Sequence, residues 1–251
     1  MGVIISEDNT VATTISSEPE SEHAYNERLF GGQFRRHYHV ARFRWLANEL
    51  RRLQLKPSRV IEIGCHDART LEFLPLRPAR YLGLDANWDG GIEIATSKWS
   101  GNSEYDFAEC KTADEIPLQG GEVFDIAIAL EVFEHLYDDV LEGYLAKLRE
   151  LVKGYLFISV PVEHGIPFVV RHALKKALGW QPEHYTAQEF FSAAFGSLDR
   201  VQRDNHKGFD YKRLVSQIDK YFRVSQIKGI TPGLPGAGFN FNVGITAARR
   251  A

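Results

Sequence analysis

The sequence predicts an α/β fold built on a central, mostly parallel sheet, and three observations support this. Short apolar runs alternate with segments of helical periodicity along most of the chain. The first apolar run ends in a glycine loop, and the second ends in an aspartate. The chain closes with two β-rich runs separated by Thr-Pro-Gly-Leu-Pro-Gly-Ala-Gly. Alternating strands and helices predict parallel strands with helices on both faces, and the closing pair predicts an antiparallel hairpin.

The expected elements follow in order from these patterns. Seven strands are expected, at 59–63, 81–84, 104–108, 124–130, 154–160, 223–230 and 239–247. Apolar residues at helical spacing predict helices over 37–53, 140–151 and 209–222. Residues 166–198 look helical and aromatic, so we expect a helical insert at about 162–210, between the fifth strand and the hairpin.

Composition restricts the classes of protein that fit. The chain has 251 residues, 44% of them hydrophobic, which suits one domain over 25–251 preceded by a disordered, polar tail at 1–24. A net charge of −3 disfavours nucleic acid as a partner. Two cysteines make neither a disulfide framework nor a metal cluster, and no stretch has the length of a transmembrane segment. These features predict a cytoplasmic protein.

The loop after the first strand indicates the kind of ligand. Val60, Ile61 and Ile63 close on Gly64, where a missing Cβ lets a ligand approach the backbone. Asp85 ends the second strand, and its carboxylate can accept from both hydroxyls of a ribose. A dinucleotide fold requires G-x-G-x-x-G, whereas this loop has a single glycine, so a pyrophosphate fits poorly.

Two motifs carry a resemblance to a known family. The run from Glu62 to Leu74 reads E-I-G-C-x-x-x-R-T-L-x-x-L, and Phe124 to Leu136 reads F-D-I-A-I-A-L-E-V-F-E-H-L. In this order and spacing they resemble the first and fourth-strand motifs of class I S-adenosylmethionine-dependent methyltransferases, over roughly residues 33–248. The resemblance implies a Rossmann-like, seven-stranded fold with a C-terminal antiparallel hairpin, and S-adenosylmethionine as the cofactor.

The resemblance also implies which residues bind the cofactor. Glu62 either accepts from the methionine amino group or a pocket amide, or serves as a structural carboxylate. His66 replaces the family's usual glycine and either fills volume beside the methionine carboxylate or contacts it. Trp88 either stacks on adenine or packs against a surface helix, and Asp114 is a candidate for the adenine amino group. The full set of expected cofactor residues is Glu62, Gly64, Cys65, His66, Asp85, Ala86, Asn87 and Leu130.

Glu131, Glu134 and His135 form an E-x-x-E-H run after the fourth strand, with a spacing that predicts one helical face. In one interpretation, Glu131 serves the cofactor pocket and His135 orients or deprotonates the acceptor. In the other, the three residues resemble the divalent-metal site of ubiquinone-pathway O-methyltransferases and small-RNA 2′-O-methyltransferases. The RNA enzymes add a later histidine, and the run N-H-K-G-F-D-Y at 205–211 resembles theirs, which makes His206 a fourth candidate ligand. Two carboxylates and one or two imidazoles suit Mg²⁺, Mn²⁺ or Zn²⁺.

The expected activity is O-methylation of a small molecule or of a sugar or glycan precursor, because a hydroxyl acceptor needs a base or a metal. The alternatives are an RNA or tRNA methyltransferase, and a regulatory protein that binds S-adenosylmethionine without turnover. The sequence names neither the acceptor nor the oligomeric state. Aromatic side chains of the insert form either a wall of the acceptor pocket or a local core: Phe168, Trp180, Tyr185, Phe190 and Phe191.

Overall fold

The computed structural model describes residues 33–177, 179, 183–204, 206–234 and 236–250. The predicted tail at 1–24 and Trp180 lie outside this range. Within it, no helix is both long enough and apolar enough to cross a bilayer.

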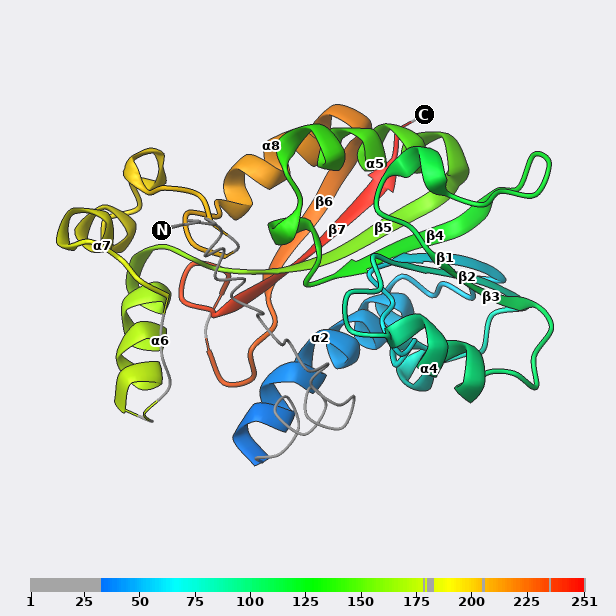
Figure 1. Cartoon of the computed structure of the whole chain (residues 1–251), viewed down its shortest axis with the longest axis horizontal. Coiled ribbons are helices and arrows are strands. Elements are labelled where there is room, and N and C mark those ends of the chain that lie inside the picture. Colours follow the sequence, from blue (N-terminus) through cyan, green and yellow to red (C-terminus); the bar gives the residue numbers. More distant parts are fainter. Residues whose placement is uncertain (1–32, 178, 180–182, 205, 235, 251) are drawn as a thin grey trace, which may run out of the picture.

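All seven predicted strands are present and form one sheet in the order β3-β2-β1-β4-β5-β7-β6 (Figure 1). The strands β1 to β5 pair in parallel, and β7 runs antiparallel to both β5 and β6, which confirms the predicted hairpin. The strands are β1 (Arg59–Ile63), β2 (Arg80–Asp85), β3 (Tyr105–Glu109), β4 (Phe124–Leu130), β5 (Val152–Pro161), β6 (Phe222–Gly229) and β7 (Asn242–Arg249).

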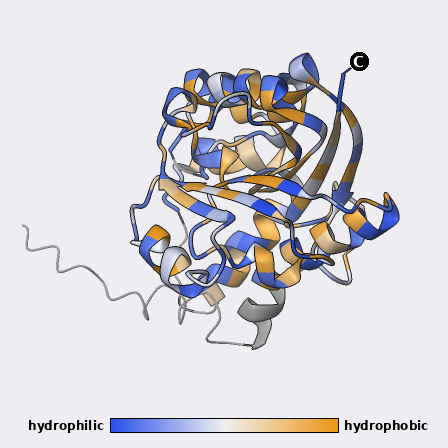
Figure 2. Cartoon of the chain, turned by 90° about the vertical axis from the view of Figure 1, so that its right-hand side faces the viewer, coloured by the Kyte–Doolittle hydropathy of each residue, from blue (hydrophilic) through white to orange (hydrophobic). Residues whose placement is uncertain are grey.

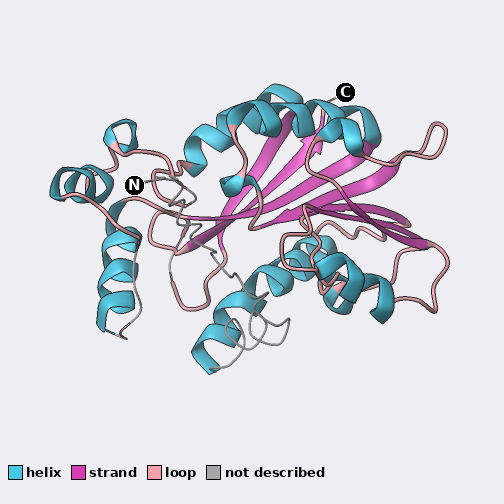
Figure 3. Cartoon of the chain, in the orientation of Figure 1, coloured by secondary structure: helices cyan, strands magenta, loops and turns pink. Residues whose placement is uncertain are grey.

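Helices cover both faces of the sheet (Figure 3). In Figure 1, α5 and α8 lie above the sheet, whereas α2 and α4 lie below it. Hydrophobic and hydrophilic positions are interleaved along these helices, as expected of amphipathic elements (Figure 2). The helices are α2 (Gln33–Arg52), α3 (Thr70–Phe73), α4 (Gly91–Lys98), η1 (Ala113–Glu115), η2 (Phe133–His135), α5 (Asp138–Leu151), α6 (Gly165–Ala177), α7 (Ala187–Ala194), η3 (Leu198–Arg200) and α8 (Tyr211–Tyr221).

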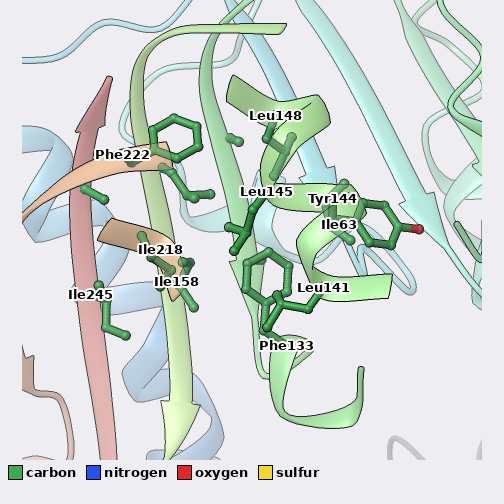
Figure 4. Close-up of a cluster of buried hydrophobic side chains, with 14 of the residues drawn as sticks. Ile63, Phe133, Leu141, Tyr144, Leu145, Leu148, Ile158, Ile218, Phe222 and Ile245 are labelled. Atoms are coloured by element: carbon green, nitrogen blue, oxygen red, sulfur yellow. The ribbon is translucent and has the colours of Figure 1, made fainter. Parts of the chain in front are cut away.

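Each face of the sheet has its own core. On one face, the apolar stripe of α5 and the buried side of α8 pack on β4, β5 and β7 (Figure 4). On the other face, α2 packs through Phe43, Trp45, Leu46 and Leu50. The Trp45 ring lies directly on Gly244 of β7, where a Cβ would come within 2.2 Å of the indole. Burial of both faces explains why these strands are nearly continuous apolar runs.

The segment between β5 and α8 forms α6, α7 and η3 around a third, small cluster. Phe168 is buried there with Ala193, Leu198 and Val201, and the rings of Tyr185 and Phe190 pack against the cluster. Of the alternatives for the aromatic residues of the insert, the local core therefore describes Phe168, Tyr185 and Phe190. Phe191 is exposed.

The strand order determines where a ligand can bind. From β1 the chain moves outward to β2 and β3, and then returns to place β4 on the other side of β1. The connections that leave the carboxyl ends of β1 and β4 therefore go to opposite sides. In open α/β sheets a ligand binds in the crevice at this switch point.

Candidate functional site

The loop after β1 lies at the switch point and uses an unusual backbone. Gly64, His66 and Ala68 all have positive φ, at 71°, 44° and 52°. The amides of Gly64 and Cys65 both donate to the carbonyl of Leu84, at 2.7 and 3.0 Å, which ties the loop to the end of β2. Gly64 is required twice over, since its φ is left-handed and a Cβ would lie 2.1 Å from a methyl carbon of Val132.

Asp85, at the carboxyl end of β2, lies beside this loop. Its carboxylate accepts from the backbone N–H of His66 at 2.9 Å and from that of Asn87 at 2.8 Å. A carboxylate offers about four acceptor positions, so this one retains capacity for ribose hydroxyls. The Asn87 side chain is used differently, because it contacts Glu93 and the Ile92 amide at the start of α4.

The structure shows the surroundings of His66 but not its role toward a ligand. The ring lies beside Asp67, which raises the imidazole pKa, and its Cα packs closely on Gly91. A non-glycine residue with left-handed φ costs about 1–2 kcal/mol, which gives a physical reason for the glycine usual in the family. Both interpretations of its role, filling volume beside a ligand and contacting it, stay predictions.

The remaining expected cofactor residues differ in exposure. Cys65 is buried, and burial raises the pKa of its thiol, so it is not a nucleophile. Leu130 is buried at the end of β4, and Ala86 is partly exposed beside Asp85. Trp88 is 76% exposed, so the predicted packing against a surface helix does not occur. Asp114 is exposed on η1.

Glu62 is enclosed by protein. Its carboxyl group is buried and accepts hydrogen bonds from the hydroxyls of Thr70, at 2.5 Å, and of Tyr81. Burial raises its pKa to about 8, against the smaller opposing effect of these two donors. Each oxygen therefore has a partner in the protein, an arrangement that favours the structural alternative over contact with the methionine amino group.

Glu131 does not share a helical face with Glu134 and His135, and that expectation is wrong. The short helix η2 begins only at Phe133, and Glu131 lies before it with a φ of 59°. Its carboxylate instead accepts from Ser159 Oγ at 2.8 Å and from Asn242 Nδ2 at 2.7 Å. The Glu131 carboxylate is thus bound to β5 and β7, and Glu131 is not among the residues whose ligand atoms converge.

Glu134, His135 and His206 do converge. One ligand atom from each lies within 4.8 Å of the others. Oε1 of Glu134 is 3.9 Å from Nε2 of His135 and 4.0 Å from Nδ1 of His206, and the two imidazole centroids are 4.5 Å apart. His206 lies beside Lys207, whose backbone pairs with that of Asp204 through two hydrogen bonds, of 2.8 and 3.1 Å.

Burial shifts the pKa values of all three residues in this cluster toward the uncharged forms. Glu134 has 0% exposure, and among the described residues neither of its carboxylate oxygens has a hydrogen-bond partner. Burial, followed by the nearby Glu131, raises its pKa well above the usual value. Burial lowers the pKa of His135, and burial together with His135 lowers that of His206 to about 4. Both imidazoles are therefore neutral at neutral pH.

Sequence reasoning missed the residues that hold this site in place. Arg203 donates to the backbone carbonyl of Glu134 at 2.6 Å, which joins η2 to the segment that carries His206. Ser159 and Asn242 hold Glu131. Each partner is at least 28 positions away along the chain, and no local pattern marks it.

Comparison with known proteins identifies the family and the fold. Residues 34–196 match a family described as a methyltransferase domain. The chain belongs to the class I S-adenosylmethionine-dependent methyltransferases. No curated protein sequence matches it.

Solved methyltransferase structures share the fold at low identity. Magnesium protoporphyrin IX methyltransferase from Synechocystis PCC 6803, with bound S-adenosylhomocysteine, is 14% identical at a TM-score of 0.57, covering 91% of this chain and 95% of its own. The N-methyltransferase NodS from Bradyrhizobium japonicum WM9, with the same ligand, is 13% identical at 0.51, covering 91% and 98%. The methyltransferase domain of a bacterial CtHen1 is 15% identical at 0.54, covering 85% and 99%.

The buried Glu62 predicts a pH dependence of stability. Its pKa of about 8 in the folded state exceeds the unfolded value of 4.5, so the native protein holds a proton that the unfolded chain releases. Stability from this group is complete below pH 4.5 and is lost as the pH rises toward 8, by at most about 1.4 kcal/mol per pH unit. Glu62→Gln should therefore gain stability relative to wild type across this window.

Urea unfolding at several pH values measures this difference. Glu150→Gln, at an exposed position of α5, is the control. An unfolding free energy of Glu62→Gln that stays parallel to wild type from pH 5 to 8 would contradict a buried, protonated Glu62.

Proposed function

We propose that this methyltransferase transfers a methyl group to a hydroxyl oxygen of a small molecule or a sugar or glycan precursor, and that the hydroxyl is bound at Glu134, His135 and His206. The observation that carries the proposal is the convergence of two neutral imidazoles on one buried carboxyl group. Glu134 and His135 follow β4, at the same edge of the sheet as Asp85, and His206 reaches them from the segment between η3 and α8. A methyl acceptor and a cofactor must meet at such an edge.

Different residues of the chain bind the cofactor and activate the acceptor. S-adenosylmethionine, when bound, supplies an electrophilic methyl group on a sulfonium. Asp85 binds the ribose with the acceptor capacity that His66 and Asn87 leave free. His135 is 31% exposed at the side chain, which allows contact with an acceptor, and its lowered pKa keeps the ring able to take a proton. We assign His135 as the general base.

The same cluster also fits a divalent cation. The buried carboxyl group of Glu134 has no hydrogen-bond partner among the described residues, and a bound metal ion would satisfy it. Ligands on an ion at about 2.1 Å lie roughly 3.0–3.5 Å apart, so distances of 3.9 and 4.0 Å require only a small closure. A carboxylate and two imidazoles suit Mn²⁺ or Zn²⁺ in particular. The two roles of His135 are alternatives, because the ring nitrogen that binds an ion cannot also take a proton. A bound ion would activate the acceptor by lowering the pKa of its hydroxyl.

An RNA acceptor is the second candidate, and one observation favours it. His206 joins the cluster, as the resemblance to small-RNA 2′-O-methyltransferases predicts. Two observations oppose it: Glu131 is bound to Ser159 and Asn242, and the net charge is −3. Labelled methyl transfer to RNA but not to small hydroxylated acceptors would replace the first proposal by this one.

Asp85→Ala should weaken binding of S-adenosylhomocysteine by about 1–3 kcal/mol, because ribose hydroxyls would lose their acceptor. Isothermal titration calorimetry measures the loss directly. Asp199→Ala, at an exposed position of η3, is the matched control and should bind as wild type does. Equal affinity for wild type and Asp85→Ala would remove Asp85 from the cofactor site.

His135→Ala should retain S-adenosylhomocysteine binding and lower the turnover of labelled methyl transfer by roughly 10²- to 10⁴-fold, the range for a general base. His184→Ala, at an exposed histidine of the insert, is the control. If His135→Ala loses cofactor binding and turnover to the same extent, the residue is structural and the assignment as base is wrong.

Mn²⁺ or Zn²⁺ should bind one site per chain, and the ion should raise the melting temperature because it binds only the folded state. Glu134→Gln and His206→Ala should each abolish the calorimetric signal, whereas His184→Ala should not. An unchanged signal in Glu134→Gln, or none in wild type, would contradict the cation. Full activity in chelator would leave His135 as a base acting alone.

A further inference from the structure

His206 is carried by the connection between η3 and α8, residues 201–204 and 206–210, which we call the His206 loop. The loop folds back on itself, because the backbones of Asp204 and Lys207 exchange hydrogen bonds of 2.8 and 3.1 Å. Gly208 then passes so close to the start of the loop that a Cβ would lie 3.2 Å from a carbonyl oxygen there. The loop is therefore compact, and its contacts with neighbouring elements determine where His206 lies.

Glu189, in the first turn of α7, holds both sides of the His206 loop. Its Oε1 accepts from the backbone N–H of Gln202 at 3.1 Å and from Nζ of Lys207 at 2.9 Å. Gln202 precedes His206 and Lys207 follows it, so one carboxylate oxygen joins both sides of the loop to α7. The side chains of Glu189 and Lys207 are each only 12% exposed, so salt screens this ion pair little.

The second oxygen of Glu189 belongs to the start of α7. Oε2 accepts from the backbone N–H of Thr186 at 2.9 Å and from its hydroxyl at 3.0 Å, and the same hydroxyl accepts from the N–H of Glu189 at 3.2 Å. This reciprocal pair is a capping box. It fixes the carboxylate on the helix and leaves Oε1 for the loop. A glutamate that only capped α7 would need neither Gln202 nor Lys207.

Arg203 attaches the opposite side of the loop to η2. Its guanidinium donates to the carbonyl oxygen of Glu134 at 2.6 Å and lies 5.0 Å over the ring of Phe209. The loop is thus held between α7 and η2. Between these two attachments, Nδ1 of His206 lies 4.0 Å from Oε1 of Glu134.

We propose that Glu189 is a positioning residue, which fixes the His206 loop so that the imidazole lies where a cation bound to Glu134 can reach it. The proposal rests on the proposed function, since it takes the cluster to be the cation site. Glu189 is not among the residues whose ligand atoms converge, so it acts only through the loop. Residues that orient metal ligands contribute roughly 10- to 100-fold to affinity. Helix α7 of the insert is then part of what builds the reaction site.

Removal of the Glu189 carboxylate tests the proposal. In the full chain, Glu189→Ala should weaken Mn²⁺ binding by roughly 10- to 100-fold in isothermal titration calorimetry, whereas S-adenosylhomocysteine should bind as it does to wild type. The turnover of labelled methyl transfer should fall, and the KM for S-adenosylmethionine should not rise. Thr186→Ala is the matched control, because it removes the helix cap and keeps the contacts of Glu189 with Gln202 and Lys207.

Two further experiments separate the position of the loop from the stability of α7. Lys207→Met should weaken Mn²⁺ binding in the same direction, and Lys207→Arg, which retains the positive charge, should restore most of it. A crystal structure of Glu189→Ala shows the loop directly. We expect η2 in its present place and Nδ1 of His206 farther than 4.0 Å from Oε1 of Glu134.

Equal Mn²⁺ affinity in Glu189→Ala and wild type would overturn the proposal. The same loss in Thr186→Ala would also overturn it, because the loss would then follow the stability of α7. A wild type that binds no Mn²⁺ would contradict the cation of the proposed function, and the crystal structure would then decide this inference separately. A displaced His206 would support the positioning role of Glu189, and an unmoved His206 would overturn it.

Discussion

The reversal of strand order at β1 is the constraint on which the site depends. The strand order sends the chain outward on one side of β1 and then on the other, so the loops after β1 and β4 must separate. The loops do this with left-handed backbone at Gly64, His66, Ala68 and Glu131, and Asn87 after β2 shares that conformation. Strain of this kind persists where the surrounding structure over-determines it, and here the buried parallel sheet supplies that support.

Two buried glutamates differ in whether the protein satisfies their carboxyl groups. Glu62 is enclosed by two hydroxyl donors, and nothing about it is left unsatisfied. Glu134 is at least as deeply buried, but its oxygens have no partner among the described residues and face two imidazoles. An unpaired buried carboxyl group costs stability. The cost is understandable if this group binds a ligand, and this contrast is the physical basis for assigning the cluster a role in the reaction.

The sequence predicted every strand and the hairpin. Strands that are buried on both faces consist mostly of apolar residues, and such runs, for example 124–130, can be recognised in the sequence. One of the two interpretations of the E-x-x-E-H run placed His206 with Glu134 and His135, through a motif and not through spacing, and the three side chains do lie together. It failed at Glu131, because E-x-x-E-H spacing implies a helix and says nothing of a left-handed φ before η2. The partners of Glu62 could not be foreseen either, since Tyr81 reaches it across the sheet from the neighbouring strand.

The central claim is that a cofactor and a hydroxyl-binding cluster share one crevice. A crystal structure of the protein with S-adenosylhomocysteine and Mn²⁺, with anomalous diffraction recorded for the ion, tests it most directly. The account predicts ribose hydroxyls on Asp85, the cofactor sulfur directed toward the cluster, and an anomalous peak among Glu134, His135 and His206. A ligand bound elsewhere, or one whose sulfur is directed away from these three residues, would contradict it.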